Sequence, residues 1–154
     1  MPPSPPMSHM ATALAEARAA ADRGEVPVGA VVVGPDGRVL AAAGNRTREL
    51  HDPTAHAEIL AIRAACRIVG AERLAGCDLY VTLEPCPMCA AAISFARIRR
   101  LYWGAADPKG GAVEHGARVF SHATCHHAPE LYGGIGEREA AELLRSFFQD
   151  RRSS

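Results

Sequence analysis

The sequence lacks long apolar runs and has no excess of either charge. No stretch approaches the roughly 20 apolar residues that cross a bilayer, and no basic-then-apolar leader opens the chain, so we expect no membrane association. Lysine plus arginine number 17 and aspartate plus glutamate number 17, which gives a formal net charge of zero. The chain therefore has no global electrostatic attraction for nucleic acid, and any such partner must be held by local patches and by shape.

Cysteines are few, and their number, five, is odd. An odd number argues against a framework of disulfides. Unpaired thiols are typical of a reducing compartment, so the composition favours a cytoplasmic protein. The five are Cys66, Cys77, Cys86, Cys89 and Cys125.

The chain has the size and composition of one globular domain. Its 154 residues are 48% hydrophobic and 22% charged, enough to bury a substantial core. Four of the first six residues are proline, which is incompatible with a helix interior. We predict a disordered tail over residues 1–9 and a single domain over residues 10–152.

Apolar periodicity predicts strands that alternate with helices after an initial hairpin. Small alanines on the first helix indicate close packing against a sheet. Segment 107–132, rich in glycine, histidine and proline, receives no assignment. The pattern indicates a three-layer α/β domain with a mixed sheet. The predicted strands are 26–33, 38–44, 78–83 and 100–105, and the predicted helices begin at Met10, near Ala55, at Cys86 and at Glu137.

Two finer predictions concern the middle helices. Asp52 or Thr54 is expected to cap the helix near Ala55, since both side chains accept hydrogen bonds from a first turn. On the Cys86 helix, four apolar residues at helical spacing are expected to face the core. They are Met88, Ala91, Ala92 and Phe95.

Two short motifs supply residues of the kind that bind catalytic zinc. His56 and Glu58 stand at the start of one predicted helix, and Cys86 and Cys89 on the first turn of another. His56 and Glu58 are about 200° apart around a helix, so they reach one point only if it lies beyond the helix N-terminus. We therefore predict that two helix N-termini face each other across a metal, where their positive dipole ends favour thiolate.

This ligand set predicts a hydrolytic zinc site. One imidazole and two thiolates leave the fourth tetrahedral position of zinc open. Zinc lowers the pKa of a bound water from ~15.7 towards ~7. Glu58 is then the natural proton shuttle, which passes a proton from the water to a ring nitrogen and later to a departing amine. One zinc ion and the removal of an amino group from an aromatic amidine are the expected outcome.

Two other interpretations of the cysteine pair stay open. A structural zinc would take a fourth protein ligand, and Cys125, His126 and His127 are the candidates. A redox dithiol also follows a strand and opens a helix. Neither interpretation gives Glu58 a role.

At these residues the chain resembles the cytidine-deaminase superfamily, and within it the bacterial tRNA adenosine deaminases. The resemblance rests on residues 25–30 (EVPVGA), 51–58 (HDPTAHAE) and 82–89 (TLEPCPMC). It implies a five-stranded α/β/α deaminase domain and the conversion of adenosine to inosine at the wobble position of a tRNA anticodon loop. It also implies a homodimer and a tRNA anticodon stem-loop as partner.

The resemblance assigns further residues to the substrate. Asn45 matches a residue that hydrogen-bonds the nucleoside, and the Ala57 backbone N–H is placed to read the base edge. Of the adjacent Phe147 and Phe148, only one can face the core squarely, and Phe148 matches an aromatic that contacts flanking nucleotides. The implied substrate-binding set is Asn45, Ala57, Val26, Pro27, Asp107 and Phe148.

Part of the chain departs from the resemblance. Residues 108–111 (PKGG) replace a more usual Lys-Thr-Gly, and residues 114–129 follow the family loosely. Two alternatives to a tRNA deaminase therefore remain. One is a deaminase of a free base or nucleoside (guanine, cytosine or adenosine), and the other is a structural zinc module that binds RNA or a protein partner.

Overall fold

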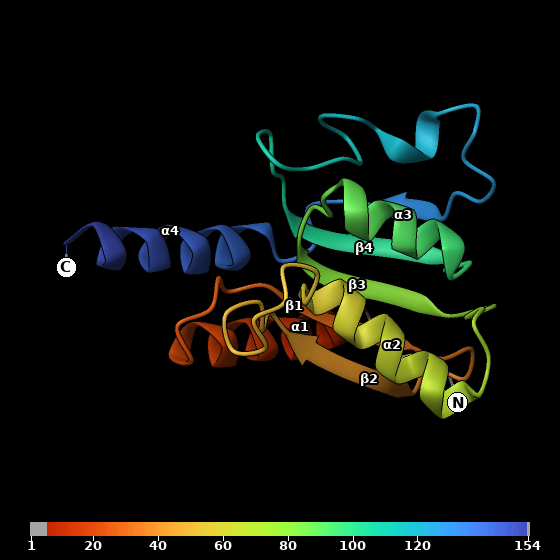
Figure 1. The fold of residues 1–154 in the computed structure, drawn as a ribbon, viewed down its shortest axis with the longest axis horizontal. Coiled ribbons are helices and arrows are strands. Elements are labelled where there is room, and N and C mark those ends of the chain that lie inside the picture. Colours follow the sequence, from red (N-terminus) through yellow and green to blue (C-terminus); the bar gives the residue numbers. More distant parts are fainter. Residues whose placement is uncertain (1–5, 154) are drawn as a thin grey trace.

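The computed structural model describes residues 6–153, which form a five-stranded mixed sheet between two layers of helices (Figure 1). The strands are β1 (Gly29–Val33), β2 (Val39–Gly44), β3 (Asp78–Leu83), β4 (Arg100–Ala105) and β5 (Glu130–Tyr132). The helices are α1 (Pro6–Asp22), α2 (Ala57–Val69), α3 (Pro87–Phe95) and α4 (Glu137–Ser153), with a short 3-10 helix, η1, at Val119–Ser121. The predicted three-layer α/β class is confirmed.

The sheet has the order β2-β1-β3-β4-β5. β1 pairs antiparallel with β2 and β3, whereas β3, β4 and β5 run parallel. Helices α2 and α3 pack on one face and α1 and α4 on the other, each over its own apolar core. Since β3 and β4 are parallel, their carboxyl ends and the loops that follow them lie at one edge of the sheet.

β3 is the central strand, and its side chains alternate between the two cores. Leu79 and Val81 pack under α2 and α3, while Tyr80 faces α1 and α4. The strand ends as the sequence predicts, at Leu83, just before Glu84.

Helix α1 lies unusually close to β1. A Cβ on Gly29 would stand 1.9 Å from the Ala13 carbonyl oxygen and 2.7 Å from the Ala17 nitrogen. Ala13 and Ala17 are fully buried at this contact. The predicted close packing of the alanine-rich helix is therefore confirmed, and it depends on a residue without a side chain in the strand.

Several element boundaries differ from the prediction. Helix α1 begins at Pro6 rather than Met10. Proline is tolerated in the first turn of a helix, because the N–H that it lacks would have no partner there. Residues 1–5 of the predicted tail lie outside the described residues. β1 begins at Gly29 rather than Val26. There the Val28 N–H turns back to the Val26 carbonyl at 2.8 Å instead of joining the sheet.

The details predicted for α2 and α3 were wrong. The N-cap of α2 is His56, without a side-chain cap, because Asp52 bonds the nearby Thr54 within the preceding loop. On α3 the buried side is Cys89, Ala90, Ile93 and Ser94. Of the predicted core stripe, Met88, Ala91 and Ala92 are only partly buried, and Phe95 is 73% exposed.

Candidate active site

The cysteines are positioned by the junction between β3 and α3. Cys86 is the N-cap of α3 in extended conformation, and Pro87 occupies the first helical position, where its fixed φ favours a helix start. One turn later Cys89 is fully buried. Both thiols therefore point to the N-terminal end of α3.

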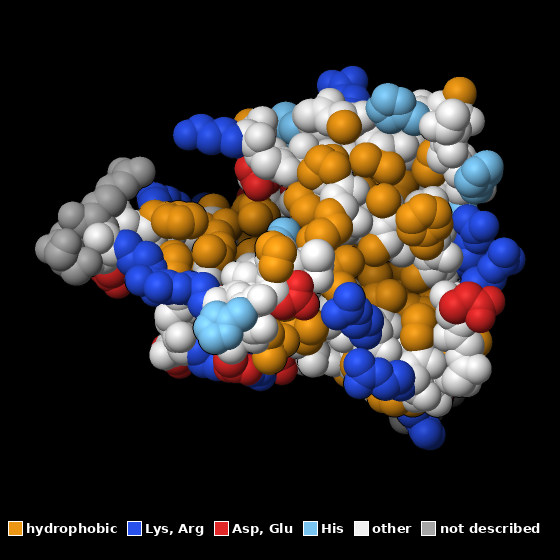
Figure 2. Space-filling view, viewed as in Figure 1, with side chains coloured by type: hydrophobic (Ala, Val, Ile, Leu, Met, Phe, Trp, Pro, Cys, Tyr) orange, Lys and Arg blue, Asp and Glu red, His pale blue; other side chains and the backbone are white. Residues whose placement is uncertain are grey.

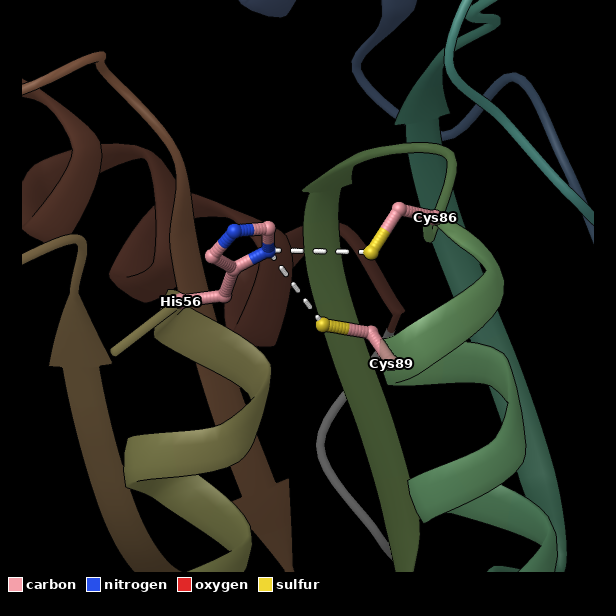
Figure 3. Close-up of side chains that lie close together, drawn as sticks. All are labelled: His56, Cys86 and Cys89. Carbon is pink, nitrogen blue, oxygen red and sulfur yellow. Dashed lines mark hydrogen bonds between the residues drawn. The ribbon is translucent and has the colours of Figure 1, made fainter. Parts of the chain in front are cut away.

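The histidine and the carboxyl group come from the start of α2. His56 is the extended N-cap of this helix, and Glu58 lies in its first turn, 4% exposed. Figure 3 shows the His56 ring and the two thiols directed toward one another from the first turns of α2 and α3. The predicted meeting of two helix N-termini is thus present.

These residues form a group with metal-ligand geometry. The His56 Nδ1 lies 3.7 Å from the Cys86 Sγ and 3.5 Å from the Cys89 Sγ, and the three atoms fall within 4.8 Å of one another. One imidazole nitrogen and two sulfurs are a donor set that suits zinc. Across residues 6–153, no other set of three histidine, cysteine or acidic side chains meets this criterion.

Cys125 and His127, two of the candidates for a fourth zinc ligand, have other hydrogen-bond partners. The Cys125 thiol contacts the Ser94 hydroxyl at 3.6 Å and the His127 carbonyl at 3.1 Å. The His127 ring bonds the Ile98 carbonyl at 2.7 Å. None of the described residues completes a four-ligand protein site, as a structural zinc would require, and the cysteines are unbridged.

Hydrogen bonds prepare the thiol pair for metal binding. A hydrogen bond from Cys89, and another from His56, lower the pKa of the Cys86 thiol to about 4. The pKa of Cys89 is raised in turn, first by its bond to Cys86 and then by burial. The pair therefore carries one negative charge readily, and the bond to that thiolate raises the pKa of His56.

Glu58 is placed as a base rather than as a ligand. Burial raises the pKa of its carboxyl group, against the lowering influence of its own backbone N–H and of His56. A carboxyl with a raised pKa accepts and releases protons nearer neutral pH, as general acid–base chemistry requires.

A cavity of about 280 Å³ opens onto this group. Three of the predicted substrate residues, Val26, Asn45 and Asp107, line it together with His56, Glu58 and Cys86. A single nucleobase with part of its sugar fits such a volume. Sequence reasoning did not single out five further lining residues: Val28, Thr47, Leu83, Glu84 and Gly110.

Three predicted substrate residues lie outside this lining. Pro27 is buried beside it, and its neighbour Val28 forms the wall instead. The Ala57 N–H donates to the Asn45 Oδ1 at 2.8 Å and thereby orients Asn45, and its predicted contact with the base edge stays a prediction. Phe148 lies on α4 and is the exposed member of the Phe147–Phe148 pair, so its contact with nucleotides stays a prediction.

Comparison with known proteins defines the class. Residues 4–105 match the model of the cytidine and deoxycytidylate deaminase zinc-binding region, and the chain belongs to this family of zinc-binding deaminases. The described helices include none long and apolar enough to cross a membrane.

Close relatives give finer likenesses. The chain is 68% identical to a tRNA-specific adenosine deaminase of Agrobacterium fabrum, over 93% of both chains. A solved structure from studies of A-to-I editing by tRNA:A34 deaminases superposes with a TM-score of 0.87 at 69% identity, covering 89% of this chain and 99% of the other. The guanine deaminase of Bacillus subtilis is 41% identical over 64% of this chain and 63% of its own, with a TM-score of 0.62.

Proposed function

We propose that this chain converts adenosine to inosine at the wobble position of a tRNA anticodon loop and releases ammonia. The observation that carries the proposal is its 68% identity, over 93% of both chains, to a tRNA-specific adenosine deaminase. The cavity and the ligand group are compatible with this reaction, since a base that leaves its stack reaches such a pocket from a single-stranded loop.

In the proposed mechanism His56, Cys86 and Cys89 hold zinc. When bound, the metal supplies an acidified water as the nucleophile. Glu58 would accept a proton from the attacking water and deliver it to a ring nitrogen of adenine. It would then pass the proton of the newly added hydroxyl group to the amine, which leaves as ammonia when its bond to carbon breaks. Its burial keeps bulk water from competing for these transfers.

The remaining lining residues hold the nucleoside. Because the Asn45 Oδ1 already accepts the Ala57 N–H, the Asn45 amide NH₂ is left as a donor for the substrate. Val26 and Val28 offer apolar surface to the base, and Asp107 lines the cavity beside Gly110.

We also propose that the chain is a cytoplasmic homodimer with a single deaminase domain over residues 10–152. The outer side of α3 and the adjoining side of α2 form an apolar surface, which we call the α3 face (Figure 2). Two hollows of about 190 and 360 Å³ flank Phe95 on this face. An exposed apolar surface of this kind is suited to a second copy of the chain. The α3 face comprises Ile59, Ala91, Ala92 and Phe95.

One assay tests the substrate. Ammonia release is compared for an anticodon stem-loop with a wobble adenosine, the same stem-loop with guanosine, free adenosine, free guanine and cytidine. We expect activity only on the first. The likeness to guanine deaminase favours guanine as the second candidate, and activity confined to free guanine would replace the tRNA assignment.

A further inference from the structure

Glu84 is a buried carboxylate next to the zinc ligands that sequence reasoning assigned no role. It follows β3 directly, precedes Pro85 and Cys86, and is 2% exposed. Its Oε1 accepts the Asp107 N–H at 3.0 Å and faces the His115 Nδ1 at 2.8 Å. Its Oε2 accepts three successive backbone N–H groups, those of Val113, Glu114 and His115, at 3.1, 3.0 and 3.0 Å.

The segment bound in this way is residues 107–115, which we call the wall loop. Asp107 and Gly110 of this loop line the cavity. Within the loop, the Asp107 carboxylate accepts the Gly110 N–H at 2.9 Å, and the Ala112 N–H donates to the Pro85 carbonyl at 2.8 Å. The wall loop is therefore held at both ends by Glu84 and Pro85, two of the residues that connect β3 to α3.

The contact between the wall loop and Glu84 leaves no room for a side chain at Gly111. A Cβ on Gly111 would stand 2.6 Å from the Glu84 Cδ and Oε2, and 2.6 Å from the Asp107 carbonyl oxygen. No rearrangement of a flexible side-chain end relieves this clash, because the Asp107 oxygen is backbone. The glycine lets the loop close onto the carboxylate.

The hydrogen-bonding capacity of both Glu84 oxygens is filled by these partners. Five donors converge on two oxygens, so no lone pair is left for substrate or for proton transfer. Without the carboxylate, several backbone N–H groups around the buried Val113 would lose their partner, which a folded loop does not tolerate. The contribution of Glu84 must therefore pass through the loop.

We propose that Glu84 is a positioning residue that fixes the wall loop as one side of the substrate cavity and thereby sets the affinity for the nucleoside. The inference rests on the proposed deaminase function. It assigns Glu84 to substrate binding and leaves metal binding and proton transfer to His56, Cys86, Cys89 and Glu58.

Two variants break the contact by different means, and a third is a matched control. Glu84→Gln keeps the size of the side chain but places an NH₂ group among N–H donors. Gly111→Ala leaves the carboxylate unchanged and forces the loop away from it. Glu114→Gln makes the same charge change on an exposed side chain of the wall loop.

Loop release has a direct readout, because Lys109 is the only lysine in the sequence. Endoproteinase Lys-C therefore cleaves at one bond, inside the wall loop. We expect native-state cleavage of Glu84→Gln and Gly111→Ala to be about tenfold faster or more, and that of Glu114→Gln to match the wild type. Equal rates in all four chains would show that Glu84 does not hold the loop.

The kinetic readout separates positioning from general destabilisation. At full zinc content, well below the melting temperature, we expect KM for the stem-loop to rise about tenfold or more in both variants, with kcat within about threefold of wild type. Zinc loss with a matching fall in kcat and an unchanged KM would overturn the proposal. If Glu84→Gln does not fold, Gly111→Ala decides alone.

Failure of the substrate assignment is visible separately. A wild-type chain that acts on free guanine instead of the stem-loop contradicts the tRNA function. KM is then compared on guanine, and the Lys-C rates need no substrate at all. The two proposals can therefore fail independently.

Discussion

Glu58 and Cys86 line the same cavity but have different tasks. Cys86 is a low-pKa thiol at a helix N-cap, suited to holding a cation. Glu58 is a buried carboxyl whose pKa is raised, suited to moving protons. Removing one or the other should therefore produce different losses.

The first prediction compares Glu58→Ala with Cys86→Ala. Glu58→Ala should keep zinc and lose deamination by about 10²–10⁴-fold, the usual range for removal of a general acid–base group. Cys86→Ala should lose both metal and activity, because two ligands hold zinc poorly. Zinc content by atomic absorption and ammonia release measure the two effects. A Glu58→Ala chain with zinc and full activity would contradict the mechanism.

The second prediction concerns the buried Glu25, which fastens the loop after β2. Burial by itself would raise its pKa, but hydrogen bonds from the N–H groups of Glu49 and Arg48 hold the pKa below the ordinary 4.5. A lowered pKa means that the stabilisation is complete above pH 4.5 and is lost as the pH falls through the folded-state value.

The measurement is urea unfolding of wild type and Glu25→Gln across pH. Glu25→Gln should be less stable by about 2 kcal/mol near neutral pH, as expected for bonds to a charged group. This difference should shrink below pH 4.5. Glu72→Gln, an exposed change on another loop, serves as the control. A difference that stays constant through the acid range would show that the charge of Glu25 is irrelevant.

At the scale of elements, the contact between α1 and β1 makes the third prediction. Gly29→Ala places a methyl group against the backbone of α1 and should destabilise the fold by about 3 kcal/mol or more, as overpacking does. Gly70→Ala, at the left-handed C-cap of α2 with φ +79° and no atom near the added methyl, should cost only about 1 kcal/mol. Equal losses in urea unfolding would mean that α1 moves aside freely.

The sequence predicts an element well where burial imposes one pattern. β3 and β4 match their predicted ranges because they are buried or paired along their whole length. The apolar stripe of α3 was assigned to the wrong side, since an alanine-rich helix has apolar residues all round and periodicity cannot choose between them. β5 was missed because three exposed residues carry no periodic signal.

The candidate site was predictable in the same selective way. Spacing and the chemistry of zinc were sufficient to predict its central residues from the sequence, namely His56, Glu58, Cys86 and Cys89. The wall loop is held by backbone N–H groups, which every residue type provides, so nothing in residues 107–115 pointed to Glu84 as their common acceptor. Side-chain chemistry can be inferred from a sequence, whereas backbone hydrogen bonding requires the fold.

At the scale of the whole molecule, the proposed dimer makes the fourth prediction. Phe95→Ser removes the largest exposed side chain of the α3 face and should weaken self-association about thirtyfold or more, as loss of a central aromatic anchor does. Ile68→Ser, which alters a comparably exposed apolar residue elsewhere on α2, should leave the association unchanged. Sedimentation velocity measures the self-association of both variants. A wild-type chain that stays monomeric would contradict the proposed dimer.

The short β5 also affects how copies of the chain can meet. An open sheet border presents unpaired backbone groups, and long apolar borders recruit strands from neighbouring molecules. Here the border beyond β4 is only three residues long, and it carries Glu130, paired with Arg100 at 3.2 Å. A foreign strand would find few partners there and would have to displace a charged pair. The sheet is thus protected against fibre-like growth at that border.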